Sequence, residues 1–240
     1  RGGGNIVYSN DGNGASGRYF KAWNLDDPLN PNLLYSNPNT NAPFSTWYPS
    51  EGTENHLGVV RNGTEALIIH TSTGERRTSI AQIDKPWKCL AFSQSGQSVY
   101  LGRGQSGTGS SLTSVDPVLE YDLDGNLLGT FDYADNYIRT NNIHPCFGSW
   151  VVSGNGFVAV NAGTDARNGD WAGIQPPYQN ATWQMMGRVH IFDPVTRNRI
   201  ATIENPLGET HSPASQRWQD KFSGEDGRYM TASGNKLLIG

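Results

Sequence analysis

The chain of 240 residues is poor in several features on which common classes of protein depend. Its only cysteines are Cys89 and Cys146, and two cysteines leave the redox compartment open. A formal net charge of −4, with no Lys/Arg cluster on any predicted face, predicts no nucleic-acid partner. No apolar run approaches the roughly 18 residues of a membrane-spanning helix, and the opening Arg1-Gly-Gly-Gly4 has no signal-peptide core. We therefore predict no membrane insertion by this segment.

Motifs that carry catalysis or bind cofactors are missing as well. The sequence has no His-Glu-x-x-His, Cys-x-x-Cys, Gly-x-Ser-x-Gly or Walker loop. The five histidines lie at spacings that predict no metal pair: His56, His70, His144, His190 and His211. We accordingly predict no catalytic residue, no metal ligand and no cofactor.

Three acidic or amide-rich stretches resemble cation loops only in part. Asp122-Leu-Asp124-Gly125-Asn126 begins like a calcium loop but lacks the remaining ligand spacing. We interpret it as a two-residue hairpin turn of the primed type, in which Asp124-Gly125 adopts positive φ. The stretches 10–13 and 165–170 are interpreted as solvated loops.

What the chain does contain is typical of a turn-rich, all-β protein. It has 29 glycines, 13 prolines and 35% hydrophobic residues, so long helices are not predicted. The clearest unit is a pair of hairpins. Residues 147–163 predict two strands around the turn Ser153-Gly-Asn-Gly156, and residues 187–206 predict two more. This pattern restarts at Phe222 and continues to Gly240.

Weaker copies of the unit precede this one. Predicted second strands begin near five positions, and the mean interval of about 58 residues fits four-stranded repeats with loop insertions: Ile6, Leu57, Val99, Phe157 and Leu237. In the second copy we predict an inner hairpin of 45–48 with 56–60 and an outer hairpin over 66–83, with Thr73-Gly74 equivalent to Thr196-Arg197. Repeated hairpin pairs favour a β-propeller over a solenoid or a sandwich.

The amino-acid sequence of the last two units resembles the FG-GAP repeat, the blade unit of integrin-α-type β-propellers. The resemblance covers Phe147 to Gly240 best, through Phe147-Gly-Ser-Trp, the Gly-Asn turns, Gly187-Arg-Val-His-Ile-Phe-Asp193 and Asn205-Pro206. It implies an adhesion-type, surface-exposed protein. Integrin-type repeats often carry an Asp-rich calcium loop between the first two strands. This chain has only Ser153–Gly156 or Ser233–Lys236 there, so calcium is not implied.

The predicted fold is thus an all-β β-propeller built of four-stranded antiparallel blades. The blades approximate to residues 1–40, 41–86, 87–140, 141–207 and, in part, 221–240. Each end of the chain is predicted to form the second strand of a blade. Closure of a ring by the chain ends needs only one such strand, so one copy is surplus. We therefore expect a partial propeller from a longer chain of about six or seven blades.

The two cysteines align one residue apart on the first strands of consecutive units. A bridge between neighbouring blades is one interpretation, and two buried free thiols is the favoured one.

Aromatic residues outside the predicted strands are the most informative candidates for function. The insertion 164–186 carries Trp171, Tyr178 and Trp183, and the linkers add Trp47, Tyr48 and Trp218. A loop longer than about 15 residues without a strand pattern is uncommon unless it is functional or disordered, and large aromatics argue against disorder. Such rings offer flat apolar faces for a glycan or a protein partner, or they pack on the propeller or another subunit.

The sequence therefore favours a non-enzymatic binding or assembly module that recognises a protein or glycan through its loops. The resemblance implies an extracellular or virion-surface location. One alternative is a structural subunit of a large assembly, such as a viral or phage appendage. Another is a propeller enzyme acting on carbohydrate, which needs converging acids. Asp165, Asp170 and Glu120 are its only candidates, and nothing in the sequence connects them.

Overall fold

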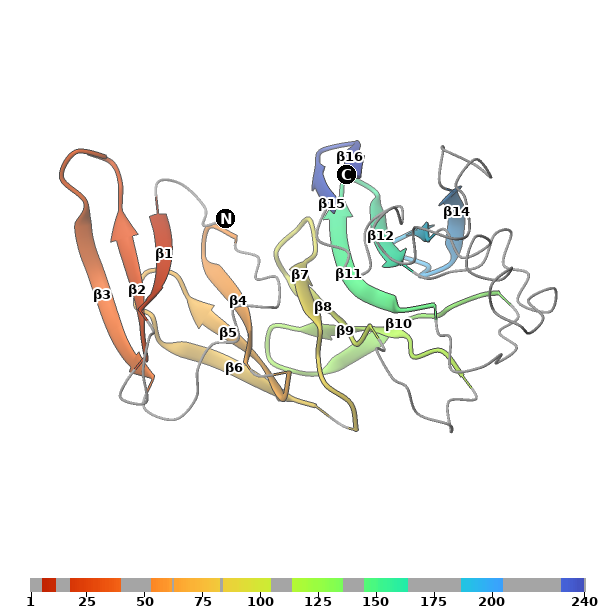
Figure 1. Cartoon of the computed structure of the whole chain (residues 1–240), viewed down its shortest axis with the longest axis horizontal. Helices are drawn as coiled ribbons and strands as arrows, with labels where there is room; N and C mark the ends of the chain where they lie inside the picture. Colours follow the sequence, from red (N-terminus) through yellow and green to blue (C-terminus); the bar gives the residue numbers. More distant parts are fainter. Residues whose placement is uncertain are drawn as a thin grey trace, which may run out of the picture. The chain divides into compact units, whose positions relative to one another are not determined.

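The structure is a computed structural model that describes residues 6–11, 18–39, 53–61, 63–82, 84–104, 114–135, 145–163, 187–204 and 230–239. The regular elements in these ranges are β-strands, which form small sheets (Figure 1). The described residues include no helix that is long and apolar enough to cross a membrane. The all-β prediction is confirmed at the level of individual sheets.

Each sheet is a meander, because strands that follow one another in the chain are neighbours in the sheet. The first sheet contains β1 (Ile6–Asp11), β2 (Arg18–Asn24) and β3 (Asn32–Asn39), and the second contains β4 (His56–Arg61), β5 (Glu65–His70) and β6 (Arg76–Ala81). The third contains β7 (Cys89–Phe92), β8 (Ser98–Gly102), β9 (Val118–Asp122) and β10 (Leu127–Phe131). The fourth contains β11 (Phe147–Gly154), β12 (Phe157–Ala162), β13 (Arg188–Phe192) and β14 (Arg199–Glu204), and the fifth contains β15 (Met230–Ser233) and β16 (Lys236–Ile239).

The chain divides into two compact units, of residues 1–100 with 121–127 and of residues 101–120 with 128–240. In the first unit, Leu57, Val59, Leu67 and Ile69 form one cluster on β4 and β5. In the second unit, Val152, Ala159, Val189 and Met230 form another, which joins β11, β12 and β13 to β15.

Burial falls from the early strands of a sheet to the last. Every residue of β7 and β8 is buried, and only one of the five in β9 is not. The last strands β6, β10 and β14 are largely exposed or half-buried. In β5 the four consecutive apolar residues Ala66-Leu-Ile-Ile69 are all buried, so side chains on both faces of this strand are covered.

The hairpin between β9 and β10 differs from the sequence prediction of a two-residue primed turn. Its loop spans 123–126, and of these residues only Gly125 has positive φ, 89°. Gly125 N donates to Asp122 O at 3.2 Å, and Asp122 N donates to Asn126 O at 2.9 Å. The Asp122 carboxylate accepts hydrogen bonds from the backbone of Asp124 and Asn126. These bonds stabilise a longer turn that ends in a left-handed glycine.

Two other hairpins confirm the predicted equivalence of Thr73-Gly74 and Thr196-Arg197. Gly74 N donates to His70 O, and Arg197 N donates to Asp193 O, both at 2.9 Å. Both residues are left-handed, with φ of 73° and 60°. A left-handed conformation costs an arginine about 1 kcal/mol or more that glycine avoids, so a contact of its side chain must offset the cost.

The predicted turn at Ser153–Gly156 is present, as Asn155-Gly156 between β11 and β12. Both cysteines are free thiols, as favoured from the sequence, but only Cys89 is buried. Cys146 is half-buried and left-handed, with φ 55°. The expectation of two buried thiols is therefore wrong for Cys146, which precedes β11 instead of lying within it.

Candidate functional site

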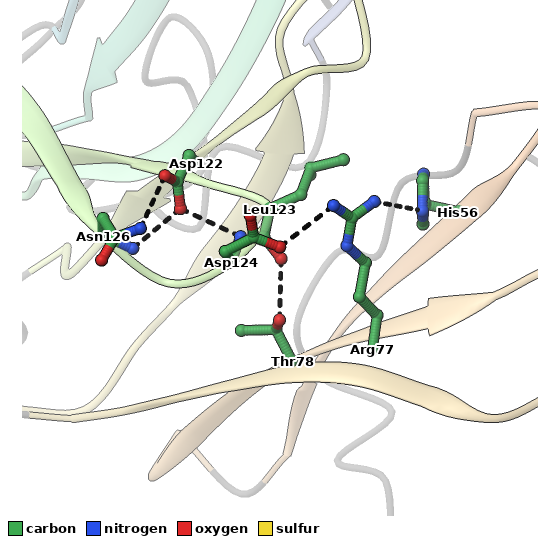
Figure 2. Close-up of polar contacts among 7 residues, drawn as sticks. All are labelled: His56, Arg77, Thr78, Asp122, Leu123, Asp124 and Asn126. Carbon is green, nitrogen blue, oxygen red and sulfur yellow. Dashed lines mark hydrogen bonds and ion pairs between the residues drawn. The ribbon is translucent and has the colours of Figure 1, made fainter.

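In the first unit, the turn between β9 and β10 contacts the last strand of the preceding sheet (Figure 2). Thr78 Oγ1 donates to Leu123 O at 2.7 Å, and Arg77 Nη2 lies 3.0 Å from Asp124 Oδ1. A Cβ added to Gly125 would lie 3.2 Å from Thr78 Cγ2, so the close approach leaves little room for a larger residue. Hydrogen bonds and shape thus fix the turn against β6.

The second unit repeats this contact with other residues. The left-handed Arg197, in the turn between β13 and β14, binds Glu120 of β9 with Nε–Oε2 and Nη2–Oε2 distances of 2.9 and 2.7 Å. The Glu120 side chain is only 8% exposed, so its charge requires a partner. A Cβ on Gly129 would lie 2.5 Å from Arg197 Nε. Gly129 is the third residue of β10 as Thr78 is the third of β6, so the same strand position meets the next turn in both units.

Alternate residues at the end of β10 and in the segment after it contact alternate residues of β13 and so form a ladder between the third and fourth sheets in this unit. Phe131 lies edge-on to Phe192, with ring centroids 5.6 Å apart, and Tyr133 lies edge-on to His190 at 5.4 Å. Asp135 completes the series, with Oδ2 2.9 Å from Arg188 Nη1. The spacing of two residues keeps Arg188, His190 and Phe192 on one face of β13, and along this face the contacts change from apolar at Phe192 to charged at Arg188.

The charged end of the ladder is a cluster of four side chains that we call the Arg188 cluster: Asp135, Arg188, Arg199 and Glu204. Arg199 Nη2 lies 2.7 Å from Asp135 Oδ1, and Arg188 Nη2 lies 3.5 Å from Glu204 Oε1. Burial alone would raise the pKa of Asp135, but its hydrogen bond to Arg199 and the charges of Arg199 and Arg188 lower it overall. Asp135 therefore stays ionised between two guanidinium groups.

The Arg188 cluster lies where three long connections meet the sheets. The chain enters 136–144 directly after Asp135 and 205–229 directly after Glu204. The insertion 164–186 follows soon after Ala162 and ends just before Arg188, and these two residues are paired across β12 and β13. Arg188 also pairs in register with Glu204. The buried Arg188 thus contacts or pairs with the described residues that border all three connections.

A second cluster of ionisable groups joins two strands in the first unit. His56 on β4 and His70 on β5 are directly opposite in register, with ring centroids 5.2 Å apart. Arg77 Nη1 lies 3.1 Å from His56 Nε2, and Figure 2 shows the two side chains facing each other. Because a guanidinium can only donate, His56 Nε2 accepts this hydrogen bond. Burial, then the charge of Arg77 and His70, lowers the pKa of His56 below its ordinary value.

The sequence prediction missed this histidine pair, because a spacing of 14 residues has no meaning as a metal motif. The register of the hairpin could have predicted the pair, because if Arg61 pairs with Glu65, then His56 must pair with His70. Among the described residues, no three His, Cys, Asp or Glu side chains are placed so that together they could hold a metal ion.

The candidate ligand contacts lie outside the described residues: Trp47, Tyr48, Trp171, Tyr178, Trp183 and Trp218. Asp165 and Asp170, two of the three acids that an enzyme would use, lie outside them too. The third, Glu120, is buried against Arg197. Its carboxylate is therefore used in a contact between sheets.

No model of a known protein family matches this chain, and no curated protein matches it either.

Proposed function

We propose that this chain is a non-enzymatic binding or assembly module of the β-propeller kind, which presents long connections for contact with a protein or glycan. The observation that carries the proposal is the Arg188 cluster. A buried, multiply paired arginine ties together the roots of the insertion 164–186 and the connections 136–144 and 205–229. Rigid elements that hold long connections at one place are typical of binding scaffolds.

Two features support sheets stacked in series as the scaffold. The turn of a later sheet meets the third residue of the preceding sheet's last strand in both units, through Thr78 and Gly129. The fall in burial toward β6, β10 and β14 is expected when blades are covered on both faces and present their last strand at the rim. Both features are consistent with a propeller.

The aromatic residues of the insertion are the proposed contacts. Trp171, Tyr178 and Trp183 combine large apolar faces with a polar group, as in stacking on sugar rings or anchoring a protein partner. An adhesion-type role at a surface follows from this chemistry and from the resemblance of 147–240 to FG-GAP repeats.

The test is a glycan array and a calorimetric titration of each glycan that binds, using the full chain. We expect the triple variant Trp171→Ala, Tyr178→Ala, Trp183→Ala to lose binding while its thermal unfolding stays that of the wild type. The matched control replaces three exposed strand residues, Leu128→Ser, Ile200→Ser and Leu238→Ser, and should bind normally. Sedimentation of both variants tests the assembly role. The proposal would be overturned if the wild-type chain bound no glycan, did not self-associate, and bound no protein partner in a way that depends on these aromatic residues.

A further inference from the structure

His56 and His70, which lie opposite each other in the first unit, form a cross-strand pair without backbone hydrogen bonds between them. His56 N and O are bonded to Thr53, at 3.0 Å to Oγ1 and 2.7 Å to N. His70 N donates to Glu75 O, and its carbonyl accepts from Gly74. The two histidines therefore exchange no backbone hydrogen bond with each other. In antiparallel sheets such pairs bring their side chains closest together.

The separation of the two rings suits a shared metal ion. With metal–nitrogen distances of about 2.0–2.1 Å, two imidazoles on one tetrahedral ion have ring centroids roughly 5 Å apart. The observed centroid distance is 5.2 Å, with the planes tilted by 43°. Both histidines are half-buried, so the rings are held in place and solvent can still reach them.

A cation already occupies one of the two ligand positions. The guanidinium of Arg77 bridges His56 Nε2 and Asp124 Oδ1, at 3.1 and 3.0 Å (Figure 2). His56 thus presents an unprotonated nitrogen toward a positive group, which is the form that a metal ion requires.

We propose that His56 and His70 form a binding site for a divalent transition-metal ion of the zinc or copper type, for which Arg77 competes. The ion binds one nitrogen of each imidazole, water completes its coordination, and the Arg77 N–H is displaced from His56 Nε2. Imidazole ligands select such ions over Mg²⁺ and Ca²⁺, which prefer oxygen. Two protein ligands are fewer than in dedicated zinc sites, so the ion exchanges with solvent. This inference is independent of the proposed binding function.

Calorimetric titration of the full chain with ZnCl₂ and CuCl₂ at neutral pH tests the site, with MgCl₂ as the negative control. His56→Gln and His70→Gln should each weaken Zn²⁺ and Cu²⁺ binding by about tenfold or more. Arg77→Gln removes the competing cation and should tighten binding. The matched controls His144→Gln and His211→Gln should leave it unchanged.

Thermal unfolding with and without Zn²⁺ provides a second readout, because an ion that joins β4 and β5 stabilises the folded state. The ion should raise the melting temperature of the wild type and of Arg77→Gln, but not that of the double variant His56→Gln, His70→Gln. No Zn²⁺ or Cu²⁺ binding by the wild type would overturn the proposal. So would binding that survives the double variant, or that Arg77→Gln weakens in a chain that still unfolds cooperatively.

Discussion

Close approaches between layers depend on single small residues, and Gly58 on β4 is the sharpest example. A Cβ at this position would lie 2.1 Å from Cδ2 of Leu90 on β7, which is itself only 2% exposed. The leucine has little room to move, because protein interiors are packed as densely as organic crystals. The absence of a side chain at Gly58 is therefore what lets β4 and β7 come together.

We predict that Gly58→Ala destabilises the chain by about 1–3 kcal/mol through overpacking. Leu90→Ala alone should cost about 2–5 kcal/mol, because it leaves a cavity. The double variant should be more stable than the sum of the two changes implies, since the new methyl group fills part of that cavity. Urea unfolding of the four proteins measures the coupling, and strict additivity would contradict the contact.

Arg197 illustrates how a side-chain contact offsets local strain. Its backbone is left-handed, with φ 60°, and its guanidinium neutralises the buried Glu120 carboxylate. Arg197→Gly relieves the strain but leaves the carboxylate without this partner, at a cost of roughly 3–5 kcal/mol for a buried pair.

We therefore predict that Arg197→Gly destabilises the chain, whereas Arg197→Gly with Glu120→Gln recovers a large part of the loss. The change at Glu120 removes the charge that Arg197 neutralises and keeps the shape of the side chain. Chemical denaturation of both variants decides the point. A single variant as stable as the wild type would show that the ion pair contributes no more than the backbone strain that glycine relieves.

At the scale of the element, the hairpin of β4 and β5 is expected to respond to acid through His56. Burial, Arg77 and His70 lower its pKa in the folded chain below the ordinary value of 6.5. The unfolded chain then binds the proton more readily, so this contribution to stability is complete above about pH 6.5 and declines as the pH falls toward the folded pKa.

We predict that, as the pH falls below about 6.5, the free energy of unfolding falls less steeply in His56→Gln than in the wild type. His211→Gln serves as the control and should keep the wild-type slope. Urea unfolding in metal-free buffer at closely spaced pH values gives both slopes. Parallel curves for the wild type and His56→Gln would contradict the lowered pKa.

The elements differ in how far the sequence predicts them. The hairpins predicted over 147–163 and 187–206 are present as β11–β12 and β13–β14, because alternation, apolar runs and turn residues all agree there. The turn at Asp124-Gly125 was predicted with the wrong type. The Asp-Gly pair is common to several hairpin loops, and the Asp122 carboxylate decides among them by bonding to backbone N–H groups.

The candidate sites were harder to predict, because contacts between elements form them. The pairing of His56 with His70 depends on strand register, and that of Arg188 with Asp135 depends on the packing of two sheets. Neither contact has a sequence spacing that is typical of a site. The aromatic residues were selected by residue type and by their place in the insertion and linkers, and they lie outside the described residues.

For the whole molecule, the proposed serial arrangement of the sheets implies that each sheet depends mainly on its neighbours in the chain. Ile68 on β5 and Phe192 on β13 are both fully buried, at 0% and 1% exposure, and each belongs to a different unit. In a serial arrangement, damage to one sheet is transmitted to the adjacent sheets and weakens with distance along the chain. A single cooperative core would instead transmit the destabilisation equally to every sheet.

We predict that Ile68→Ala, which should cost about 2–5 kcal/mol, increases amide hydrogen exchange most in β4–β6 and least in β15–β16. Phe192→Ala, at about 3–5 kcal/mol, should show the reverse order, with the largest increase in β11–β14 and the smallest in β1–β3. Exchange measured by mass spectrometry on peptides from all five sheets, at pH and temperature where both variants stay folded, separates the two patterns. Equal increases in every sheet from either variant would contradict serial packing and favour one cooperative core.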